Sequence, residues 1–417
     1  MTQASTSPTQ LNERATILDI LRGFALLGIF LANSAVFSLF VMQDSKVTDS
    51  YSTAGIDKWL GWFHFAFIDG KFYSLFSLLF GIGFSIIFLR NKAKGLNGLT
   101  IFYRRLAVLF LFGLAHCLLL WDGDILMFYA VVGMFLPLFR NVADKTLVIL
   151  AICLLASPLL FDLAKVLSDG KLDISQPFLQ KALARTNELG ITQENSGTWL
   201  ITNTRYKDLL NWSSSGFWWS WFLRLNSNRP VKVLAMFLIG LYVGRNLIYS
   251  RLEEYKTLLK KVQLFGLGLG ISAGIMHAYF ELDKKHLPAT EGLWDTLSYA
   301  LNVAPLSLGY AATIALWYVS RKNLWLLQPL RHVGRMALTN YIMQSALGVF
   351  IYYGIGLGMA ANAGPALFMP IAVGVFIIQV IYSKIWLSYF NYGPLEWIWR
   401  MLTYGKYLPL LKPSPTG

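Results

Sequence analysis

The chain has 417 residues, of which 55% are hydrophobic and only 14% are charged, whereas about a quarter of the residues in an average soluble domain are charged. This composition argues against a soluble globular domain, and long apolar runs along the whole chain indicate a polytopic membrane protein. The net charge of +14 comes with no zinc-finger spacing or other nucleic-acid motif. We therefore attribute it to Lys and Arg in cytoplasmic loops and expect no nucleic-acid partner.

Apolar runs predict an all-α fold, a polytopic membrane helical bundle of about ten transmembrane helices. The runs do not alternate between polar and apolar residues, as the strands of a membrane β-barrel would. In chain order the expected spans are 17–41, 72–90, 101–121, 124–140, 145–165, 231–249, 262–280, 295–320, 334–357 and 366–390. The run 124–140 is the shortest, and residues 57–69, "DKWLGWFHFAFID", predict a short aromatic helix near the membrane interface.

Charge in the connections predicts the topology. Lys and Arg gather in alternate connections, at Arg90, Lys92, Lys94, Arg104 and Arg105, at Arg245, Arg251, Lys256, Lys260 and Lys261, and at Arg321, Lys322, Arg331 and Arg335. The positive-inside rule then places both termini in the cytoplasm. The expected parts are a cytoplasmic N-terminal tail, a five-helix membrane portion, an extracytoplasmic loop region, a second five-helix portion and a cytoplasmic C-terminal tail, at 1–16, 17–165, 166–230, 231–390 and 391–417.

Two boundary segments leave separate questions. The first apolar run is too long for the core of a signal peptide, so we expect a retained span. The loop region 166–230 carries the aromatic stretch "NWSSSGFWWSWFLRL". It could form a lid over an outward-facing site, or it could be a plain connection.

Polar residues recur at one spacing inside two spans. Arg105 and His116 are eleven residues apart, and Arg22 and Asn33 repeat that spacing. Eleven residues are close to three helical turns, so each pair shares one helix face over roughly 16 Å. Polar side chains in spans usually face the bundle interior or a wet cavity. The two faces predict one cavity, basic at its cytoplasmic end and hydrogen-bonding at its outer end.

His116 is the first candidate for a general base. Asp122 and Asp124 follow in "HCLLLWDGD", and a carboxylate that accepts from one imidazole nitrogen raises the basicity of the other. Alternatively, His116 extends to the interface and "DGD" is a turn that caps the next helix. His64 is the rival, with Asp69 and Lys71 close behind it, although an interfacial histidine among aromatic residues would look the same.

The remaining polar residues complete the expected cavity. Asp19 and Arg335 lie at the starts of spans, and Asn340 and Gln344 are spaced i, i+4, so the last two either bind ligand or bond neighbouring helices. Small-residue packing is expected at Gly81 and Gly83, and Cys117 is more easily an apolar filler than a nucleophile. His277, His286 and His332 lie at span ends and are expected to be solvated. Five scattered histidines without ligand spacing predict no metal site.

Five long motifs resemble the YeiB family of bacterial inner-membrane proteins. They are "RATILDILRGFALLGIFLANS", "KFYSLFSLLFGIGF", "GLAHCLLLWDGDILMFYAVVG", "GRMALTNYIMQS" and "YFNYGPLEWIWRMLTYGK". The likeness covers essentially the whole chain and implies a multi-pass protein of the bacterial inner membrane. More distantly, "LDILRGFALLGIFLAN" resembles the start of the transmembrane acyltransferase superfamily, which includes sugar O-acyltransferases and the lysosomal heparan glucosaminide acetyltransferase.

The superfamily resemblance implies an acyl transfer. Acyl-CoA, with acetyl-CoA as the simplest case, would be the donor, and Arg22, Arg104 and Arg105 would hold its phosphates. A sugar, glycan or lipid would be the acceptor, activated by a histidine. Asn33 stands where the sugar O-acyltransferases have histidine. The lysosomal enzyme also has asparagine there and takes its histidine from a later segment, in which this chain carries His64.

Three functions remain open at this point. The first is a membrane acyltransferase that moves an acyl group from cytoplasmic acyl-CoA to an extracytoplasmic or membrane acceptor. The second is a secondary transporter or flippase that uses the same polar cavity for solute or protons. The third is a non-catalytic accessory protein surrounded by membrane lipids, in which the polar residues hold helices together.

Overall fold

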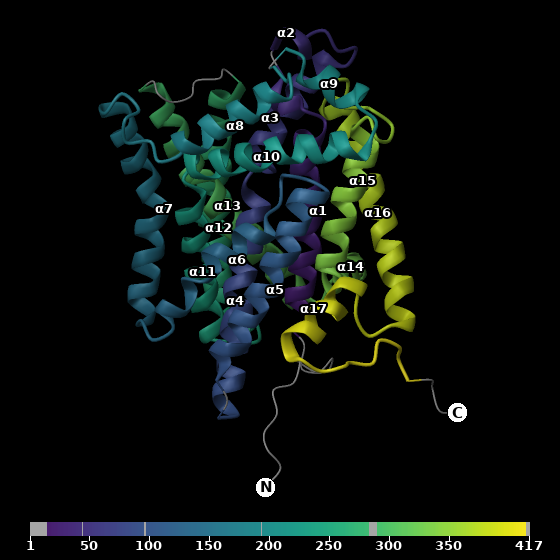
Figure 1. The fold of residues 1–417 in the computed structure, drawn as a ribbon. Helices are drawn as coiled ribbons and strands as arrows, with labels where there is room; N and C mark the ends of the chain where they lie inside the picture. Colours follow the sequence, from purple (N-terminus) through teal and green to yellow (C-terminus); the bar gives the residue numbers. More distant parts are fainter. Residues whose placement is uncertain (1–14, 44, 96, 193, 283–289, 414–417) are drawn as a thin grey trace.

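The computed structural model describes residues 15–413 except for 44, 96, 193 and 283–289, and this part is built almost entirely of helices (Figure 1). Among these residues, the β-structure is one isolated bridge between Phe390 and Leu411. The long helices are α1 (Thr16–Phe37), α4 (Lys71–Ala93), α5 (Gly98–Leu119), α7 (Asp144–Leu167), α12 (Lys256–Leu282), α13 (Glu291–Ser320) and α16 (Pro365–Tyr389). The shorter ones are α2 (Ser45–Thr48), α3 (Ala54–Phe67), α6 (Leu126–Gly133), α8 (Gln176–Glu188), α9 (Ser196–Thr202), α10 (Tyr206–Asn226), α11 (Arg229–Arg245), α14 (Gln328–Arg335), α15 (Ala337–Tyr352) and α17 (Pro394–Tyr404).

Seven stretches of the described chain are long and apolar enough to cross a membrane, so the expected polytopic helical bundle is confirmed. They are the seven long helices, with α3 joined to α4 as one stretch from Ala54 to Ala93. The aromatic segment expected near the interface is thus the start of this stretch. The other three expected spans, 124–140, 231–249 and 334–357, consist of helices shorter than these, namely α6, α11 and the pair α14 and α15.

The span expected at 124–140 is short because its helix ends inside the run. Helix α6 ends at Gly133 and is followed by a 3₁₀ turn that contains Pro137. Proline lacks the N–H group that a continuing helix needs. The guanidinium of Arg245 on α11 donates to the carbonyls of Val142 at 2.6 Å and Arg140 at 2.8 Å. These bonds satisfy carbonyls in the connection that follows the 3₁₀ turn.

The span expected at 334–357 is divided at Met336, between α14 and α15. The backbone N–H groups of Leu338 and Thr339, in the first turn of α15, donate to Oε1 of Glu396 at 2.6 and 3.1 Å. A carboxylate is favourable there because the N-terminal end of a helix carries partial positive charge. Glu396 belongs to α17, so the segment expected as a C-terminal tail is instead fixed against the membrane bundle.

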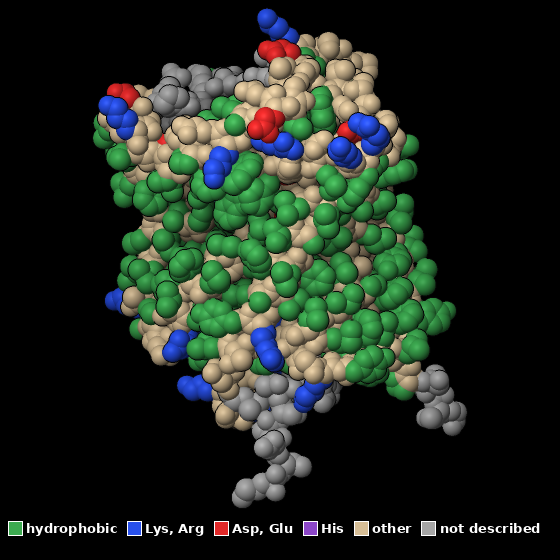
Figure 2. Space-filling view, viewed as in Figure 1, with side chains coloured by type: hydrophobic (Ala, Val, Ile, Leu, Met, Phe, Trp, Pro, Cys, Tyr) green, Lys and Arg blue, Asp and Glu red, His purple; other side chains and the backbone are tan. Residues whose placement is uncertain are grey.

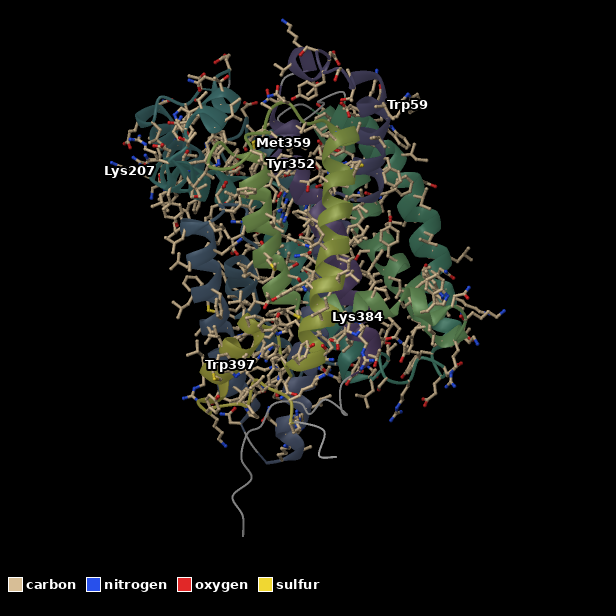
Figure 3. All side chains as sticks on the ribbon, turned by 90° about the vertical axis from the view of Figure 1, so that its right-hand side faces the viewer. Trp59, Lys207, Tyr352, Met359, Lys384 and Trp397 are labelled. Carbon is tan, nitrogen blue, oxygen red and sulfur yellow. The ribbon has the colours of Figure 1, made fainter. Side chains whose placement is uncertain are left out.

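The bundle has two distinct ends. Helices α8, α9 and α10 lie at one end, with α10 running across the other helices, and α14 and α17 lie at the opposite end (Figure 1). We call these the α10 end and the α17 end. In the side view of Figure 3, Trp59 and Lys207 lie at the α10 end, whereas Lys384 and Trp397 lie toward the α17 end. The region 166–230 is therefore a set of helices folded onto the bundle rather than a plain loop.

Hydrophobic side chains cover the middle of the face seen in Figure 2. Lys and Arg lie at both ends of this face, whereas Asp and Glu are visible only at the α10 end. An apolar belt between two polar ends is the surface that a lipid bilayer requires. The same view shows that the α17 end is the more purely basic end of this face.

Glycine allows close packing of α4 against α11. A Cβ atom at Gly81 would strike the carbonyl of Phe237, and one at Gly240 would strike the carbonyl of Leu78. Helices α4 and α11 therefore touch backbone to backbone, and the expected small-residue packing is confirmed for Gly81. Gly83 differs, because a Cβ atom there would have no neighbour within 4 Å.

Candidate functional site

A cavity of about 210 Å³ opens within the bundle near the α17 end. Its walls come from α1, α4, α5, the start of α6, the break between α14 and α15, and α17. Four arginines and one carboxylate line it: Arg22, Arg105, Arg335, Arg400 and Glu396. Glu396 is bonded to the start of α15, and four guanidinium groups beside this one carboxylate make the lining basic.

Neighbouring residues hold the arginines in place. Nη1 of Arg22 donates to Oδ1 of buried Asp19 at 2.7 Å. The guanidinium of Arg105 lies 4.3 Å from the ring centroid of Trp399, whose indole N–H donates to the Arg105 carbonyl at 3.2 Å. The guanidinium of Arg400 lies 5.0 Å from the ring centroid of Tyr392. Such supported guanidinium groups form a pre-organised site for phosphate or carboxylate.

The rest of the cavity is apolar. Its wall includes Leu26, Ile29, Phe76, Phe80, Leu106 and Leu109. Along α4 the lining runs from Phe76 to Ile87, which corresponds to roughly 16 Å of helix. The wall then reaches Ile125, Leu126 and Tyr341. A narrow apolar passage therefore leads away from the arginines toward the join between α5 and α6.

His116 and Asp124 form a buried pair at that join. Nδ1 of His116 lies 2.9 Å from Oδ1 of Asp124, and both side chains are at most 1% exposed. The second oxygen of Asp124 accepts from the backbone N–H of Met127 at 2.7 Å. Nε2 of His116 has no hydrogen-bond partner within the described part of the chain. The expected histidine–carboxylate pair therefore forms with Asp124, which also caps α6.

Tyr341 connects this pair with the cavity. Its ring lies 5.2 Å from the ring of His116, between centroids, and its hydroxyl oxygen accepts from the backbone N–H of Ile125 at 3.2 Å. Tyr341 and Ile125 also line the cavity. The His116–Asp124 pair is thus one side chain away from the passage that begins at the arginines.

Arg224 of α10 reaches the same join from above. Its guanidinium donates to the Asp124 carbonyl and lies 5.6 Å from the ring centroid of Phe128. Burial raises the pKa of the Asp122 carboxyl to about 6, while Arg224 and His116 act in the opposite direction. Within the described part of the chain, Asp122 forms no hydrogen bond to His116 and instead packs against Gly216 of α10. Its expected role beside the histidine therefore belongs to Asp124.

The structure sorts the remaining cavity candidates. Arg22, Arg105 and Arg335 line one cavity, as the spacing predicts for the first two. Arg104, adjacent to Arg105, is exposed and does not line it. Consecutive helix residues point about 100° apart, so only one of the two can face inward. Asn33 is partly exposed and also lies outside the lining.

Asn340 and Gln344 bond neighbouring helices instead of lining the cavity. Nδ2 of Asn340 donates to Oγ of Ser383 at 2.9 Å. Nε2 of Gln344 donates to Oε1 of Gln379 at 2.9 Å. Neither residue lines the cavity, and the donation of both amide nitrogens to α16 agrees with the alternative interpretation, bonds between neighbouring helices.

The other histidines lie elsewhere. His64 is buried in α3, with its ring 5.9 Å from that of Phe368 on α16, measured between centroids, and it does not line the cavity. His277 is fully buried and its Nδ1 lies 2.7 Å from Oδ1 of Asp295, so the interpretation of His277 as solvated is wrong. His332 is partly buried. His286 lies outside the described residues.

Two residues of the site, Arg400 and Arg224, are not predicted from the sequence. Arg400 stands in "LEWIWRML". Polar and apolar residues recur in this segment at the spacing of an amphipathic helix. That pattern could have shown an amphipathic helix in place of a tail. Arg224 had no comparable signal, because its partner is a backbone carbonyl one hundred residues away.

Comparisons with known proteins extend over the whole chain. Residues 243–406 match the family described as "Protein of unknown function (DUF418)". The "Uncharacterized protein YxaH" of Bacillus subtilis (strain 168) is 33% identical over 418 residues, covering 99% of each chain. The "Uncharacterized protein YeiB" of Escherichia coli (strain K12) is 29% identical over 406 residues, covering 94% of this chain and 96% of that protein. No solved structure matches significantly.

Proposed function

Because this chain belongs to the YeiB family, with its DUF418 region, we propose that it is a membrane-bound acyltransferase of that family. It moves an acyl group, acetyl in the simplest case, from cytoplasmic acyl-CoA to an extracytoplasmic or membrane acceptor. One observation carries the proposal. A single cavity begins at Arg22, Arg105, Arg335 and Arg400 and ends at Tyr341, beside the buried His116–Asp124 pair.

The shape and charge of the cavity suit this donor. Phosphate groups pair with guanidinium groups through short, charge-assisted hydrogen bonds. A volume of about 210 Å³ is below the usual range for pockets that enclose a whole drug-sized ligand. The passage therefore accommodates an extended arm such as pantetheine, while the nucleotide part of CoA remains at the α17 end.

The His116–Asp124 pair supplies the proton transfer. Asp124 accepts the Nδ1–H of His116, which leaves the lone pair of Nε2 free to act as a base. Nε2 takes a proton from an acceptor hydroxyl or amine as that atom attacks the thioester carbonyl carbon. The C–S bond then breaks, and the CoA thiolate leaves and takes up the proton. The ring of Tyr341 lies between the cavity and His116. The ring must therefore turn aside for the thioester to reach His116.

The orientation follows from the charges. On the face in Figure 2, the α17 end carries Lys and Arg without visible Asp or Glu, and positive charge favours the cytoplasmic side. In the bacterial inner membrane, this orientation gives the arginines access to cytoplasmic acyl-CoA. It places His116 toward the α10 end, where sugars, glycans or lipid head groups outside the cytoplasm serve as acceptors.

Binding of acetyl-CoA to the purified protein in nanodiscs tests the donor. Arg105→Gln should weaken binding about ten- to hundredfold, because it removes charged hydrogen bonds to phosphate. Arg104→Gln is the matched control, since Arg104 is adjacent but exposed, and it should bind as the wild type does. Isothermal titration calorimetry measures both, and a thermal melt checks that both variants are folded.

Equal affinities for the two variants, or no binding by the wild type, would contradict the proposal. In that case, solute uptake into proteoliposomes without acyl-CoA would support the transporter. If both assays are negative and double substitutions lower only the melting temperature, the accessory function is supported.

A further inference from the structure

A second polar cluster lies outside the cavity, where α12 and α13 meet near the α10 end. His277 and Glu281 lie on α12, and Asp295 lies on α13. One ligand atom from each of the three side chains lies within 4.8 Å of the other two. None of the three lines the cavity with the arginines. The cluster is therefore separate from the proposed acyl-transfer site.

The sequence of α12 explains why these residues meet α13. Gly266, Gly270 and Gly274 follow one another at four-residue spacing, so they lie on one helix face. A Cβ atom at Gly266 would lie 2.5 Å from the Pro305 carbonyl, and one at Gly270 would lie 2.7 Å from Cβ of Leu306. The two helices therefore pack in close contact, and His277 and Glu281 continue the same face.

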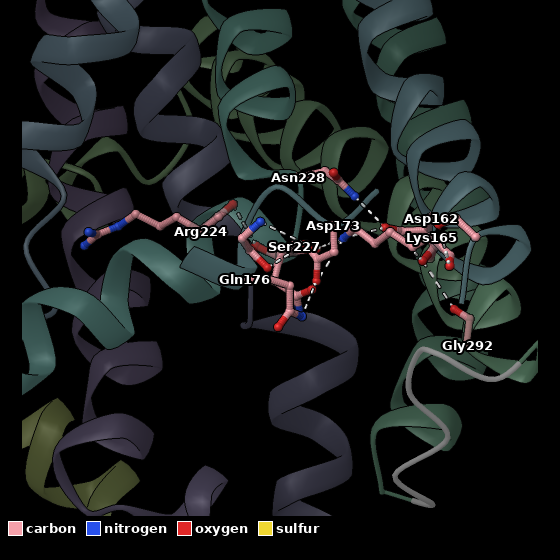
Figure 4. Close-up of polar contacts among 12 residues, drawn as sticks. Asp162, Lys165, Asp173, Gln176, Arg224, Ser227, Asn228 and Gly292 are labelled. Carbon is pink, nitrogen blue, oxygen red and sulfur yellow. Dashed lines mark hydrogen bonds and ion pairs between the residues drawn. The ribbon is translucent and has the colours of Figure 1, made fainter. Parts of the chain in front are cut away.

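A hydrogen-bond network fixes the start of α13 next to Asp295. Oγ1 of Thr296 donates to Oδ2 of Asp162 at 2.7 Å, and Lys165 pairs with Oδ1 of that carboxylate at 3.0 Å. Nδ2 of Asn228 also donates to Oδ1 of Asp162, at 2.8 Å. Figure 4 shows Asp162, Lys165 and Asn228 drawn together with the Gly292 turn of α13. Asp295 thus projects from backbone that α7 and the start of α11 hold in place.

Burial and charge make the cluster unusual. The His277 side chain is 0% exposed and that of Asp295 is 17% exposed. Nε2 of His277 has no hydrogen-bond partner among the described residues. Two ammonium groups lie nearby. Nζ of Lys71, which interacts with Glu281, donates to the Phe65 carbonyl at 2.6 Å. Nζ of Lys232, which interacts with Asp295, lies 4.0 Å from the Tyr299 ring centroid. An imidazole nitrogen and two carboxylate oxygens this close together have the geometry of a donor set for a metal ion.

We infer that His277, Glu281 and Asp295 bind a divalent first-row transition metal ion, with zinc and manganese as the ions that fit. One imidazole nitrogen and two carboxylate oxygens form a mixed donor set that both ions accept. An all-oxygen set would be expected for magnesium or calcium. Three protein ligands leave at least one coordination position for water. The partial exposure of Asp295 gives the ion a route to the site.

Metal content tests this inference directly. The full-length protein, stripped with a chelator and dialysed against Zn²⁺ or Mn²⁺, should retain about one ion per chain by mass spectrometry of the metal. His277→Gln, Glu281→Gln and Asp295→Asn should each weaken binding by about tenfold or more. His64→Gln and Glu253→Gln are controls, a buried histidine and an exposed glutamate outside the cluster, and should bind as the wild type does.

Two measurements keep the test decisive. Zinc-edge X-ray absorption on the wild type should show one imidazole nitrogen with oxygen ligands and no sulfur, whether or not a variant folds. Wild-type metal content no higher than that of the three variants, or a zinc environment without imidazole, would overturn the inference. Neither readout uses acyl-CoA, so failure here is distinguishable from failure of the proposed function.

Discussion

Asp124 has three tasks at once in this structure. One carboxylate oxygen pairs with His116, the other accepts from the Met127 N–H, and its backbone carbonyl accepts from Arg224. The side chain thus orients the imidazole and accepts from the first turn of α6, while Arg224 links the same residue to α10. A carboxylate in this position selects the tautomer that leaves Nε2 basic.

Asp124→Asn should lower the rate of acyl transfer, or of CoA release in the absence of acceptor, by about a hundredfold or more, because proton transfer by a positioned base contributes on that scale. Acetyl-CoA affinity should change little, since the arginines are untouched. Asp122→Asn is the matched control and should retain the rate, because Asp122 faces Gly216. Release of CoA, followed with a thiol reagent, measures all three proteins. Equal losses in both variants would remove Asp124 from its assigned role.

Residue spacing predicted part of this site and missed the rest for a physical reason. Helical periodicity identifies residues that share a face, so Arg105 and His116 could be placed along one helix from the sequence. It does not indicate which face turns inward, so Arg104 and Arg105 could not be separated. Groups joined across helices, such as His277 with Asp295, depend on packing that no local pattern encodes.

Two glycines of α4 that are close in sequence have different surroundings. Gly81 lies against the backbone of α11, whereas Gly83 lines the cavity and has open space where a Cβ atom would stand. The sequence presents both as the same motif, "GIG". Only the packing separates a glycine that permits helix contact from one that leaves room for a ligand.

Gly83→Phe should fill the passage and weaken acetyl-CoA binding at least about tenfold, while the melting temperature stays near that of the wild type. Gly268→Phe is the control, because Gly268 also has no neighbour within 4 Å but lies outside the cavity. Gly81→Val should instead lower stability by about 1–3 kcal/mol through overpacking against α11. Calorimetric titration and thermal melts separate these outcomes. Unimpaired binding by Gly83→Phe would show that ligand does not use the passage.

The observed helix boundaries agree with those expected from the sequence where the apolar runs are long. They differ where a helix ends inside the run. The long spans, such as α7 and α16, lie close to their expected ranges because hydrophobic length largely decides them. The expected spans at 124–140 and 334–357 are interrupted. Glu396 accepts from the backbone at the break before α15, and Arg245 donates to backbone carbonyls of the connection between α6 and α7. Partners so far along the chain cannot be read from local sequence.

At the scale of the whole molecule, the two polar sites have different characters. The α17 end presents a cavity with four arginines, and its passage leads toward a buried histidine–carboxylate pair. Near the α10 end, the His277–Glu281–Asp295 cluster collects metal-binding groups. Helices α8 to α10 cover this end, and Arg224 links them to the His116 join. The fold thus combines a basic entrance on one side with a covered polar region on the other.

In the proposed function, an acyl group passes along the cavity from the arginines to His116. The most direct test of this path is a cryo-electron microscopy structure of the protein in nanodiscs with a non-hydrolysable acetyl-CoA analogue. We predict phosphate density at Arg22, Arg105, Arg335 and Arg400, the pantetheine arm between α4 and α5, and the acetyl carbonyl beside His116 with Tyr341 turned aside. Analogue bound elsewhere, or an unchanged cavity at saturating analogue, would rule out this path for the acyl group.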